Sequence, residues 1–441
     1  MAKKTVSRRN FLEAAALGGG SIVLGACAAP AAPEAPAAKE PVTIQANIAF
    51  TQADYGLQYR TVEKWRDLFQ ETHPGVTVNL AFVDWTEHHN KMLVLAAAGQ
   101  LPDFVEVQAS RSLLWAIEGV FLPIDEFVGA DAKFGMSDFF EGVMGYYRWK
   151  DKIYALPYDH GPSILGYNKK MFDEQGVAYP DESWTFDTLL EKAVSFTKDG
   201  ESWGFSGSPK GWLLEPSYLM PWGGKLFNDD ETECLITMPE SVAALQWWVD
   251  LRLKNKVAPT PAQSEVLATA GGNFVSGKVA MTTVAPWDAP TWNALADFEW
   301  DVAPWPKGPV ARTTAGLGSG YGITKDTKHP EEAWAFLRWM TSSEGLAFVW
   351  SSTGASTPPR KSAFDIYFSA AGVAKHAQYF LDAMNDYMEV ARPLSPNGPE
   401  FESIRNREMD LINEGLKSVE QGCADMKTDG DPILAKNSKN A

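Results

Sequence analysis

The chain has 441 residues, a formal net charge of −17 at pH 7 and 17 Trp. Such an acidic protein binds nucleic acid and anionic lipid poorly, so we exclude both as partners. After residue 26 no stretch reaches 18 consecutive apolar residues, which excludes a transmembrane helix in the rest of the sequence.

The first 26 residues have the layout of an export signal. Four basic residues within positions 3–9 precede an apolar stretch, Phe11–Ala26, that is too short for a stable membrane span. Ser7–Leu12 (SRRNFL) resembles the twin-arginine export signature, and Leu24–Cys27 (LGAC) resembles a bacterial lipobox. The resemblance implies that Cys27 becomes the lipidated N-terminus. The alternative is an ordinary signal peptide that contains a cysteine.

The mature chain begins with a tether and continues as a folded body. Residues 28–41 are mostly Ala, Pro and Glu, and we expect them to hold the body away from the membrane. The body is long enough for two lobes of ordinary domain size. Two isolated cysteines, Cys234 and Cys423, leave open whether a disulfide joins them.

Strand and helix patterns alternate along the first part of the body. Val42–Phe50, Val76–Phe82 and Phe104–Val107 have the composition or alternation of strands. Apolar residues between Leu57 and Phe69 recur at helical spacing, as do those of Ala333–Met340 far along the chain. This order predicts an α/β protein with mainly parallel sheets.

Several blocks of the body resemble, in the same order, the extracellular solute-binding proteins of the maltose-binding type. The blocks are Phe69–Val78, Leu95–Phe104, Ile153–Tyr158 with Leu165–Lys169, Phe274–Met281 with Ala285–Trp287, and Gly318–Ile323 with His329–Trp334. Each block is weak alone, but together they span nearly the whole mature chain.

The resemblance implies a two-lobed α/β fold, in which each lobe is a mainly parallel sheet flanked by helices and the ligand binds in the cleft between the lobes. We assign residues 42–157 and 308–352 to the first lobe, residues 160–303 and 358–428 to the second, and residues 429–441 to a C-terminal tail. Segments rich in Pro, Gly or small residues are expected to cross between the lobes. They are Pro157–Ser163, Pro304–Gly308 and Ser352–Arg360.

The sequence contains no catalytic or metal-binding constellation, such as GxSxG, HExxH or paired CxxC. His88 and His89 are adjacent and point to different faces of a helix, so we interpret them as solvated residues rather than a metal pair. Gly272–Lys278 fits the start of a P-loop. Val279 stands where the loop needs Ser or Thr, so we interpret the segment as a helix end, a turn and a strand. We expect no cofactor and no metal.

The abundance of aromatic residues favours a sugar site. Sugars present flat C–H faces and a rim of hydroxyls, which aromatic planes ringed by carboxylates, amides and hydroxyls can bind. Most aromatic residues belong to the core, so we selected residues at strand ends, where open α/β sheets place ligands, and positions implied by the resemblance. The candidates are Tyr55, Asp84, Trp85, Glu106, Gln108, Arg111, Tyr158, Asp159, His160, Trp222, Trp287, Asp288, Ser319, Tyr321 and Arg360.

The resemblance also indicates which sugar not to expect. Arg111 matches a position at which maltodextrin binders carry a ligand-contacting arginine. Their aspartate just before it is Ser110 here, and their stacking tryptophan is Val107. We therefore do not predict maltose itself.

Five candidates have specific interpretations. Trp287 matches a position at which sugar-binding relatives supply a stacking ring, and we expect Asp159 beside it to accept sugar hydroxyls. His160 contacts the ligand or, alternatively, bonds to backbone and holds the hinge. Tyr158 and Trp222 either contact the ligand or, alternatively, pack within the hinge or a loop.

These observations predict the substrate-binding component of an ABC importer. We expect a monomer, anchored through Cys27 outside the cytoplasmic membrane, that captures a mono- or oligosaccharide and delivers it to the permease subunits. The same fold could instead carry glycerol phosphodiester, polyamine or metal; a phosphate cargo would favour Arg111 and Arg360 as receptors. A secreted glycoside-active enzyme is the remaining alternative, and it would need two carboxyl groups roughly 5–9.5 Å apart.

Overall fold

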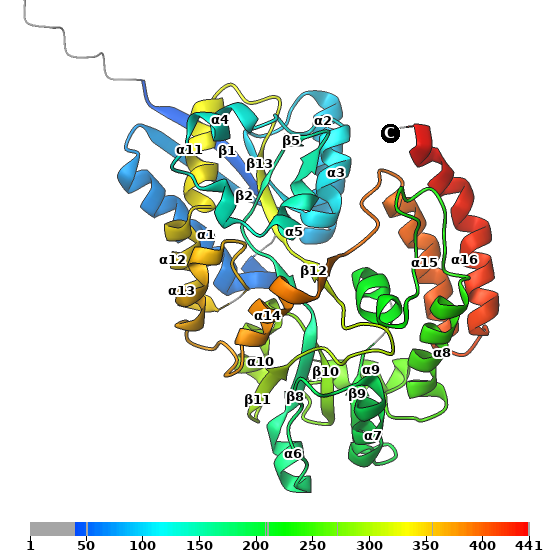
Figure 1. Cartoon of the computed structure of the whole chain (residues 1–441). Helices are drawn as coiled ribbons and strands as arrows, with labels where there is room; N and C mark the ends of the chain where they lie inside the picture. The colour runs from blue at the N-terminus through cyan, green and yellow to red at the C-terminus, as the bar shows by residue number, and fades with distance from the viewer. Residues whose placement is uncertain are drawn as a thin grey trace, which may run out of the picture. The chain divides into compact units, whose positions relative to one another are not determined.

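The computed structural model describes residues 40–49, 52–207, 209, 211–270, 272–354 and 356–439 (Figure 1). The export signal, Cys27 and most of the tether lie outside the described residues. The residues from Pro41 onward belong to one structural unit. No helix in the described part of the chain combines the length and the apolar character needed to cross a bilayer.

The first sheet has five strands in the order β2-β1-β3-β13-β6. β1 is parallel to β2 and β3, whereas β13 is antiparallel to β3 and β6. The strands are β1 (Val42–Ile48), β2 (Val76–Phe82), β3 (Phe104–Gln108), β6 (Leu156–Pro157) and β13 (Ser319–Ile323). The three strands predicted in the first part of the body are confirmed, although β1 ends at Ile48.

Helices flank this sheet. They are α1 (Gln52–Thr72), α2 (Trp85–Ala98), α3 (Ala109–Ile117), α4 (Asp125–Ala130), α5 (Glu141–Met144), α11 (Pro330–Met340), α12 (Ser343–Thr353) and α13 (Phe364–Phe368). The predicted stripe of α11 is confirmed, because Ala333, Phe336, Leu337 and Met340 are all fully buried. The ring of Phe336 packs on Phe104 of β3, which fixes α11 against the sheet.

The second sheet has four strands in the order β11-β8-β10-β9. They are β8 (Ile164–Asn168), β9 (Trp203–Ser206), β10 (Val279–Val284) and β11 (Trp300–Ala303). The helices of this part are α6 (Lys169–Gln175), α7 (Phe186–Phe196), α8 (Pro239–Leu253), α9 (Pro261–Ala268), α10 (Ala289–Leu295), α15 (Gly398–Asn413) and α16 (Val419–Leu434). Side-chain oxygens of Thr185 and Ser418 cap α7 and α16 at their first turns.

A small third sheet joins the two large ones. Its order is β14-β12-β7, with β7 (Gly161–Pro162), β12 (Thr314–Leu317) and β14 (Met388–Val390), which follows α14 (Gln378–Asp386). The chain runs from β6 of the first sheet through β7 to β8 of the second, and returns from β11 through β12 to β13. The second crossing therefore forms at β12, further along the chain than the expected Pro304–Gly308. This sheet is the hinge sheet of the following sections.

The third expected crossing also reaches the hinge sheet. The backbone N–H of His160 donates to the carbonyl oxygen of Thr357 at 3.2 Å, and the Thr357 hydroxyl donates to the carbonyl of His160. The remaining strands form a short hairpin, β4 (Arg148–Trp149) and β5 (Lys152–Ile153), beside α3.

Two expectations about the C-terminal part differ from the structure. Residues 429–434 are the end of α16, and Asn437 is buried, so these residues are folded rather than a free tail. Helix α13, which we assigned to the second lobe, packs on α12, and its Phe364 contacts Phe140. The residue limits of the lobes stay a prediction. Cys234 and Cys423 are both buried free thiols in this structure.

The P-loop alternative is excluded by local structure. Helix α9 ends at Ala268, turns follow, and β10 begins at Val279, so no helix follows Lys278. The two adjacent histidines of α2 correct our interpretation. His88 is fully buried, with Nε2 2.8 Å from the carbonyl oxygen of Glu106, and His89 is half-buried. Burial lowers the pKa of His88 to about 4 and that of His89 to about 3, so both are neutral near pH 7.

Candidate functional site

The candidate site is built where β6 leaves the first sheet for the hinge sheet. Asp159 lies between β6 and β7, and its Oδ1 accepts a hydrogen bond from the backbone N–H of Ser319 at 2.5 Å. The carbonyl oxygen of Ser319 accepts in turn from the N–H groups of Tyr158 and Asp159. The predicted residues Tyr158, Asp159 and Ser319 are therefore brought together, although β13 lies far from them in the sequence.

A second carboxyl group lies beside this junction. Glu106 is in the buried strand β3 and pairs in register with Tyr321 of β13. Its Oε1 accepts from the Tyr158 hydroxyl at 2.8 Å and its Oε2 from the N–H of Ala49 at 2.9 Å. The ring of Tyr158 stacks on Tyr321, with centroids 4.4 Å apart. We call Glu106, Tyr158, Asp159, Ser319 and Tyr321 the hinge cluster.

Burial dominates the electrostatics of the hinge cluster. It raises the pKa of Glu106 to about 7, against the opposing hydrogen bonds from Ala49 and Tyr158, and the charge of Asp159 raises it further. It also raises the pKa of Asp159 to about 7, opposed by the hydrogen bond from Ser319. Near neutral pH each carboxyl group can therefore accept a hydrogen bond or donate one, which suits a ligand with hydroxyl groups.

His160 is fully buried beside the hinge cluster. Neither ring nitrogen has a hydrogen-bond partner among the described residues, and burial lowers the pKa of its imidazole to about 3. The ring lies 5.5 Å from that of Tyr146, and a Cβ at Gly316 would lie 2.8 Å from Nε2. His160 thus packs within the hinge sheet as a neutral group, and its role toward a ligand stays a prediction.

Two indoles approach the same junction from the second sheet. Pro286 packs against Gly161 so closely that a Cβ there would lie 2.6 Å from the proline ring. The next residue, Trp287, is half-buried, and its ring lies 5.8 Å from that of Trp212 at an angle of 51°. We call Trp212 and Trp287 the indole pair. Trp212 was missed from the sequence, because it follows β9, a strand that we did not predict.

Two predicted aromatic and basic residues lie elsewhere. Trp222 packs inside the second part of the molecule, stacked on Phe186 with centroids 4.6 Å apart, which favours its packing alternative. Arg360 is 2% exposed and donates to the carbonyl oxygens of Thr341 and Gly135. The structure brings neither of them to the hinge cluster.

The remaining candidates occupy strand and helix ends. Tyr55 lies within α1, not in a loop as expected, because the helix begins at Gln52; its side chain is outside the description. Asp84 accepts backbone N–H groups of α2 at its carbonyl, and Trp85 packs on His89. The Gln108 carboxamide accepts from Ser110.

Two charged candidates have partners within the chain. Asp288 accepts from the N–H of Ala285 at 2.8 Å, which closes the turn that presents Trp287. Arg111, on α3, pairs with Glu402 on α15 at 3.5 Å. Glu402 was missed, because it lies 291 residues from Arg111 and no local pattern marks it.

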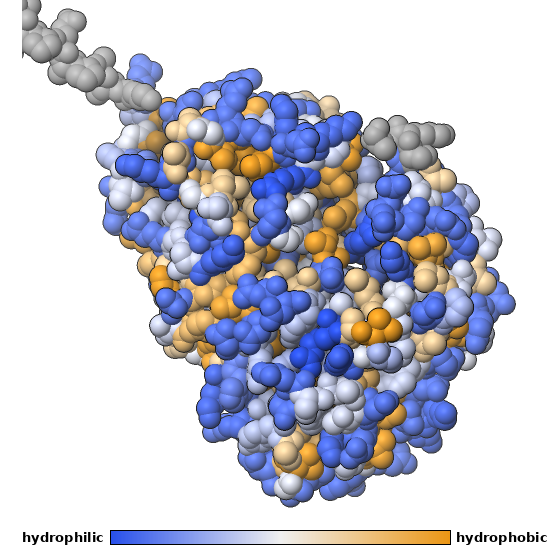
Figure 2. Space-filling model, viewed as in Figure 1, coloured by the Kyte–Doolittle hydropathy of each residue, from blue (hydrophilic) through white to orange (hydrophobic). Residues whose placement is uncertain are grey.

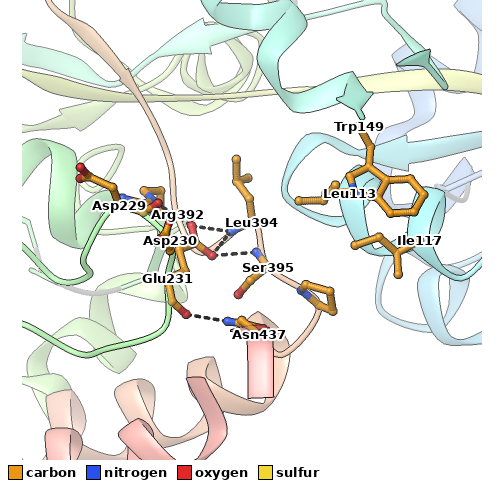
Figure 3. Close-up of a pocket in the computed structure, with 11 residues that line it drawn as sticks. Leu113, Ile117, Trp149, Asp229, Asp230, Glu231, Arg392, Leu394, Ser395 and Asn437 are labelled. Carbon is orange, nitrogen blue, oxygen red and sulfur yellow. Dashed lines mark hydrogen bonds and ion pairs between the residues drawn. The ribbon is translucent and has the colours of Figure 1, made fainter. Parts of the chain in front are cut away.

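A separate pocket of about 300 Å³ lies near α3 and contains none of the predicted residues. Figure 3 shows Leu113, Ile117 and Trp149 on one wall, and Glu231 with Arg392 and Ser395 on the other. Arg392 donates to Glu231 at 2.7 Å, and the backbone N–H groups of Leu394 and Ser395 donate to the same carboxylate. In Figure 2 hydrophobic surface beside α3 faces hydrophilic surface near α15.

The described residues contain no group of three or more His, Cys, Asp or Glu side chains placed to hold a metal ion. The hinge cluster combines two carboxyl groups with two tyrosines, and Tyr158 joins both kinds of group by its hydrogen bond to Glu106 and its stacking on Tyr321.

Comparison with known proteins identifies the family. The family model described as bacterial extracellular solute-binding protein matches residues 50–347. The chain belongs to this family. A putative binding protein of Brucella abortus is 24% identical over 400 residues, covering 89% of this solute-binding protein and 93% of the relative. An erythritol/L-threitol-binding protein of Mycolicibacterium smegmatis is 23% identical and covers 85% of both chains.

Solved structures confirm the fold. An ABC substrate-binding protein of Listeria monocytogenes in complex with cycloalternan aligns with a TM-score of 0.79 at 21% identity, over 90% of this solute-binding protein and 99% of that chain. The two-lobed α/β fold that the resemblance implied is therefore confirmed. The prediction of mainly parallel sheets is corrected for one strand in each, because β13 runs antiparallel to both of its neighbours in the first sheet and β8 to both of its neighbours in the second. The family and these relatives are binding proteins rather than enzymes.

Proposed function

We propose that this solute-binding protein captures a sugar outside the cytoplasmic membrane and delivers it to the permease of an ABC importer. Among the relatives named above, one is an erythritol/L-threitol-binding protein and one was solved in complex with cycloalternan. The observation that carries the proposal for this chain is the hinge cluster beside the indole pair. Carboxyl and tyrosine hydroxyl groups lie where the first sheet joins the hinge sheet, and Pro286, the residue before the half-buried Trp287, packs against Gly161, two residues after Asp159.

Each group has a role in this proposal. Trp287 stacks on the C–H face of a pyranose ring, with Trp212 as a second plane at an angle to it. Asp159 accepts hydrogen bonds from the hydroxyls, and Glu106 holds Tyr158 in place behind it. Since the hinge sheet connects both large sheets, closure around the ligand would bring both walls of the site together.

The test is a thermal-shift screen of the mature protein against a broad library of sugars and sugar alcohols. A ligand at about 100 times its dissociation constant stabilises the folded state by about 2.7 kcal/mol, which is easily measured. Stabilisation by one sugar or by a related group of sugars supports the proposal. A library without a single stabilising sugar would refute it, and turnover of a chromogenic glycoside panel would favour the enzyme alternative instead.

We also propose that the protein is a monomer anchored to the outer face of the cytoplasmic membrane through lipid on Cys27, after export by the twin-arginine route. The support is the order of the two signals in residues 1–27. Cys27→Ala should move the protein from the membrane fraction to the soluble one on cell fractionation. A variant that sediments with membranes as firmly as wild type contradicts the anchor.

A further inference from the structure

Glu402 of α15 lies between two arginines. Its Oε2 is 3.5 Å from Nη2 of Arg111, and its Oε1 is 3.5 Å from Nη2 of Arg405. Arg111 comes from α3, beside the first sheet, whereas Arg405 is on the same helix as Glu402 and packs with the second part of the molecule. One carboxylate thus joins guanidinium groups from the two sides of the molecule.

The two arginines differ in their access to solvent. The Arg405 side chain is 2% exposed, and its Nη1 has no hydrogen-bond partner among the described residues. The Arg111 side chain is 31% exposed and that of Glu402 is 27% exposed, so a solute can reach both. Guanidinium groups stay protonated in proteins, so a pair of them is a strong receptor for phosphate or carboxylate.

From the sequence, Arg111 and Arg360 are the two expected receptors for an anionic cargo. In the structure each of them pairs with a carboxylate of the protein. Arg360 is buried, with its guanidinium 3.9 Å from the centroid of the Phe139 ring and in contact with Asp138. Arg111 is paired with Glu402. An anionic group of a solute would have to displace the Glu402 carboxylate or lie next to it, and like charges at such distances repel.

We propose that Glu402 is a specificity residue that prevents Arg111 and Arg405 from binding anionic solutes, because its carboxylate occupies the position between the two guanidinium groups that a phosphate or carboxylate group would take. This inference rests on the proposed function and narrows the cargo to uncharged sugars and sugar alcohols. It excludes sugar phosphates, sugar acids and glycerol phosphodiester.

The experiment measures stabilisation by inorganic phosphate and by matched pairs of solutes. Wild type and Glu402→Gln are titrated with phosphate, with sodium chloride at equal ionic strength as the salt control. Both are then compared on glucose with glucose 6-phosphate, and on glycerol with glycerol 3-phosphate. Glutamine keeps the shape of the side chain while removing the charge, so it removes the repulsion of an anion and leaves a weaker, displaceable partner for both guanidinium groups.

We expect phosphate to stabilise wild type no more than chloride does. Glu402→Gln should bind phosphate at least about tenfold more tightly than wild type, as expected for a charge-assisted hydrogen bond. Its preference for phosphorylated over neutral solutes should rise by at least about the same factor. Adding Arg111→Gln to Glu402→Gln should abolish the gain, because the exposed receptor is removed.

Glu400→Gln is the matched control. Glu400 lies in the first turn of α15, carries the same charge and pairs with Lys436 at 3.1 Å, away from Arg111. Its removal should leave the phosphate response at the wild-type level, although it changes the net charge and the charge near the helix N-terminus by the same amount.

The outcomes separate the two proposals. Phosphate stabilisation of wild type equal to that of Glu402→Gln, or a Glu402→Gln variant without any gain, overturns the role of Glu402. A wild type that no neutral sugar stabilises refutes the proposed function, while the phosphate titration still decides the role of Glu402. If Glu402→Gln fails to fold, the wild-type titration still tests the role of Glu402. Stabilisation of wild type by phosphate beyond that by chloride overturns it.

Discussion

Two aromatic clusters of this solute-binding protein look alike in the sequence and differ in the structure. Trp222 stacks on Phe186, beside Trp248 and the fully buried Trp305, in the core of the second part. The indole pair is half-buried like Trp222, but Trp287 follows Pro286, which packs against Gly161 of the hinge sheet. The comparison teaches that the surroundings of an indole, rather than its place at a strand end, separate a core residue from a candidate ligand platform.

The core cluster should show the largest effect on stability. Trp305 donates its indole N–H to the carbonyl oxygen of Ser217 at 3.0 Å and is fully buried. Trp305→Ala should lower the free energy of unfolding by about 3–5 kcal/mol, since it removes a buried ring and leaves a cavity. Urea unfolding measures it. A loss below about 1 kcal/mol would show that this cluster does not belong to the core and would contradict its contrast with the indole pair.

The indole pair should show the opposite pattern. Trp287→Ala should weaken sugar binding by about thirtyfold, or about 2 kcal/mol, as for a central aromatic anchor. Unfolding of the unliganded protein should change little, because the ring is half-buried. Trp287→Phe should recover part of the affinity, since a smaller ring still offers a plane. Calorimetric titration with the best sugar of the library measures the affinity, and unchanged affinity with a large loss of stability would identify Trp287 as a core residue.

The hinge cluster adds a pH dependence that the core cluster lacks. The pKa of Glu106 is raised from 4.5 to about 7, so the folded state binds more protons than the unfolded state between these values. The stability that this group contributes is complete below about pH 4.5 and is lost as pH rises to about 7. Glu106→Gln should therefore gain stability relative to wild type, on the order of 2–3 kcal/mol, between pH 4.5 and pH 8.

Urea unfolding of both proteins across this range measures the difference. The surface variant Glu118→Gln, which changes an exposed carboxylate, is the control for the general effect of removing a charge. A stability difference between Glu106→Gln and wild type that stays constant from pH 4.5 to pH 8 would contradict the raised pKa of Glu106.

Local pattern predicted the elements well. The alternation of Val76–Phe82 and the stripe of Ala333–Met340 each specify which face is buried, and both elements form where expected. The pattern was less informative where tertiary contacts decide. Tyr55 was expected in a loop, but the helix begins before it. His88 and His89 were interpreted as solvated, yet the first sheet and α3 enclose them.

The site was predictable only in part for the same reason. The family-like segment around Tyr158 and the block ending at Trp287 pointed to two walls that the structure brings to one junction. Trp212 and Glu402 were missed, because their partners are distant in sequence and the contact exists only in the folded chain. Trp222 and Trp287 are both half-buried, so their ring partners, Phe186 and Trp212, separate them, and those contacts exist only in the folded chain.

A crystal structure of the complex with the sugar that stabilises the protein most tests the central claim directly. The account predicts a sugar ring stacked on Trp287, with a hydroxyl within hydrogen-bond distance of the Asp159 carboxylate. A sugar bound instead in the pocket between Trp149 and Ser395, with the hinge cluster and the indole pair free of ligand, would contradict it.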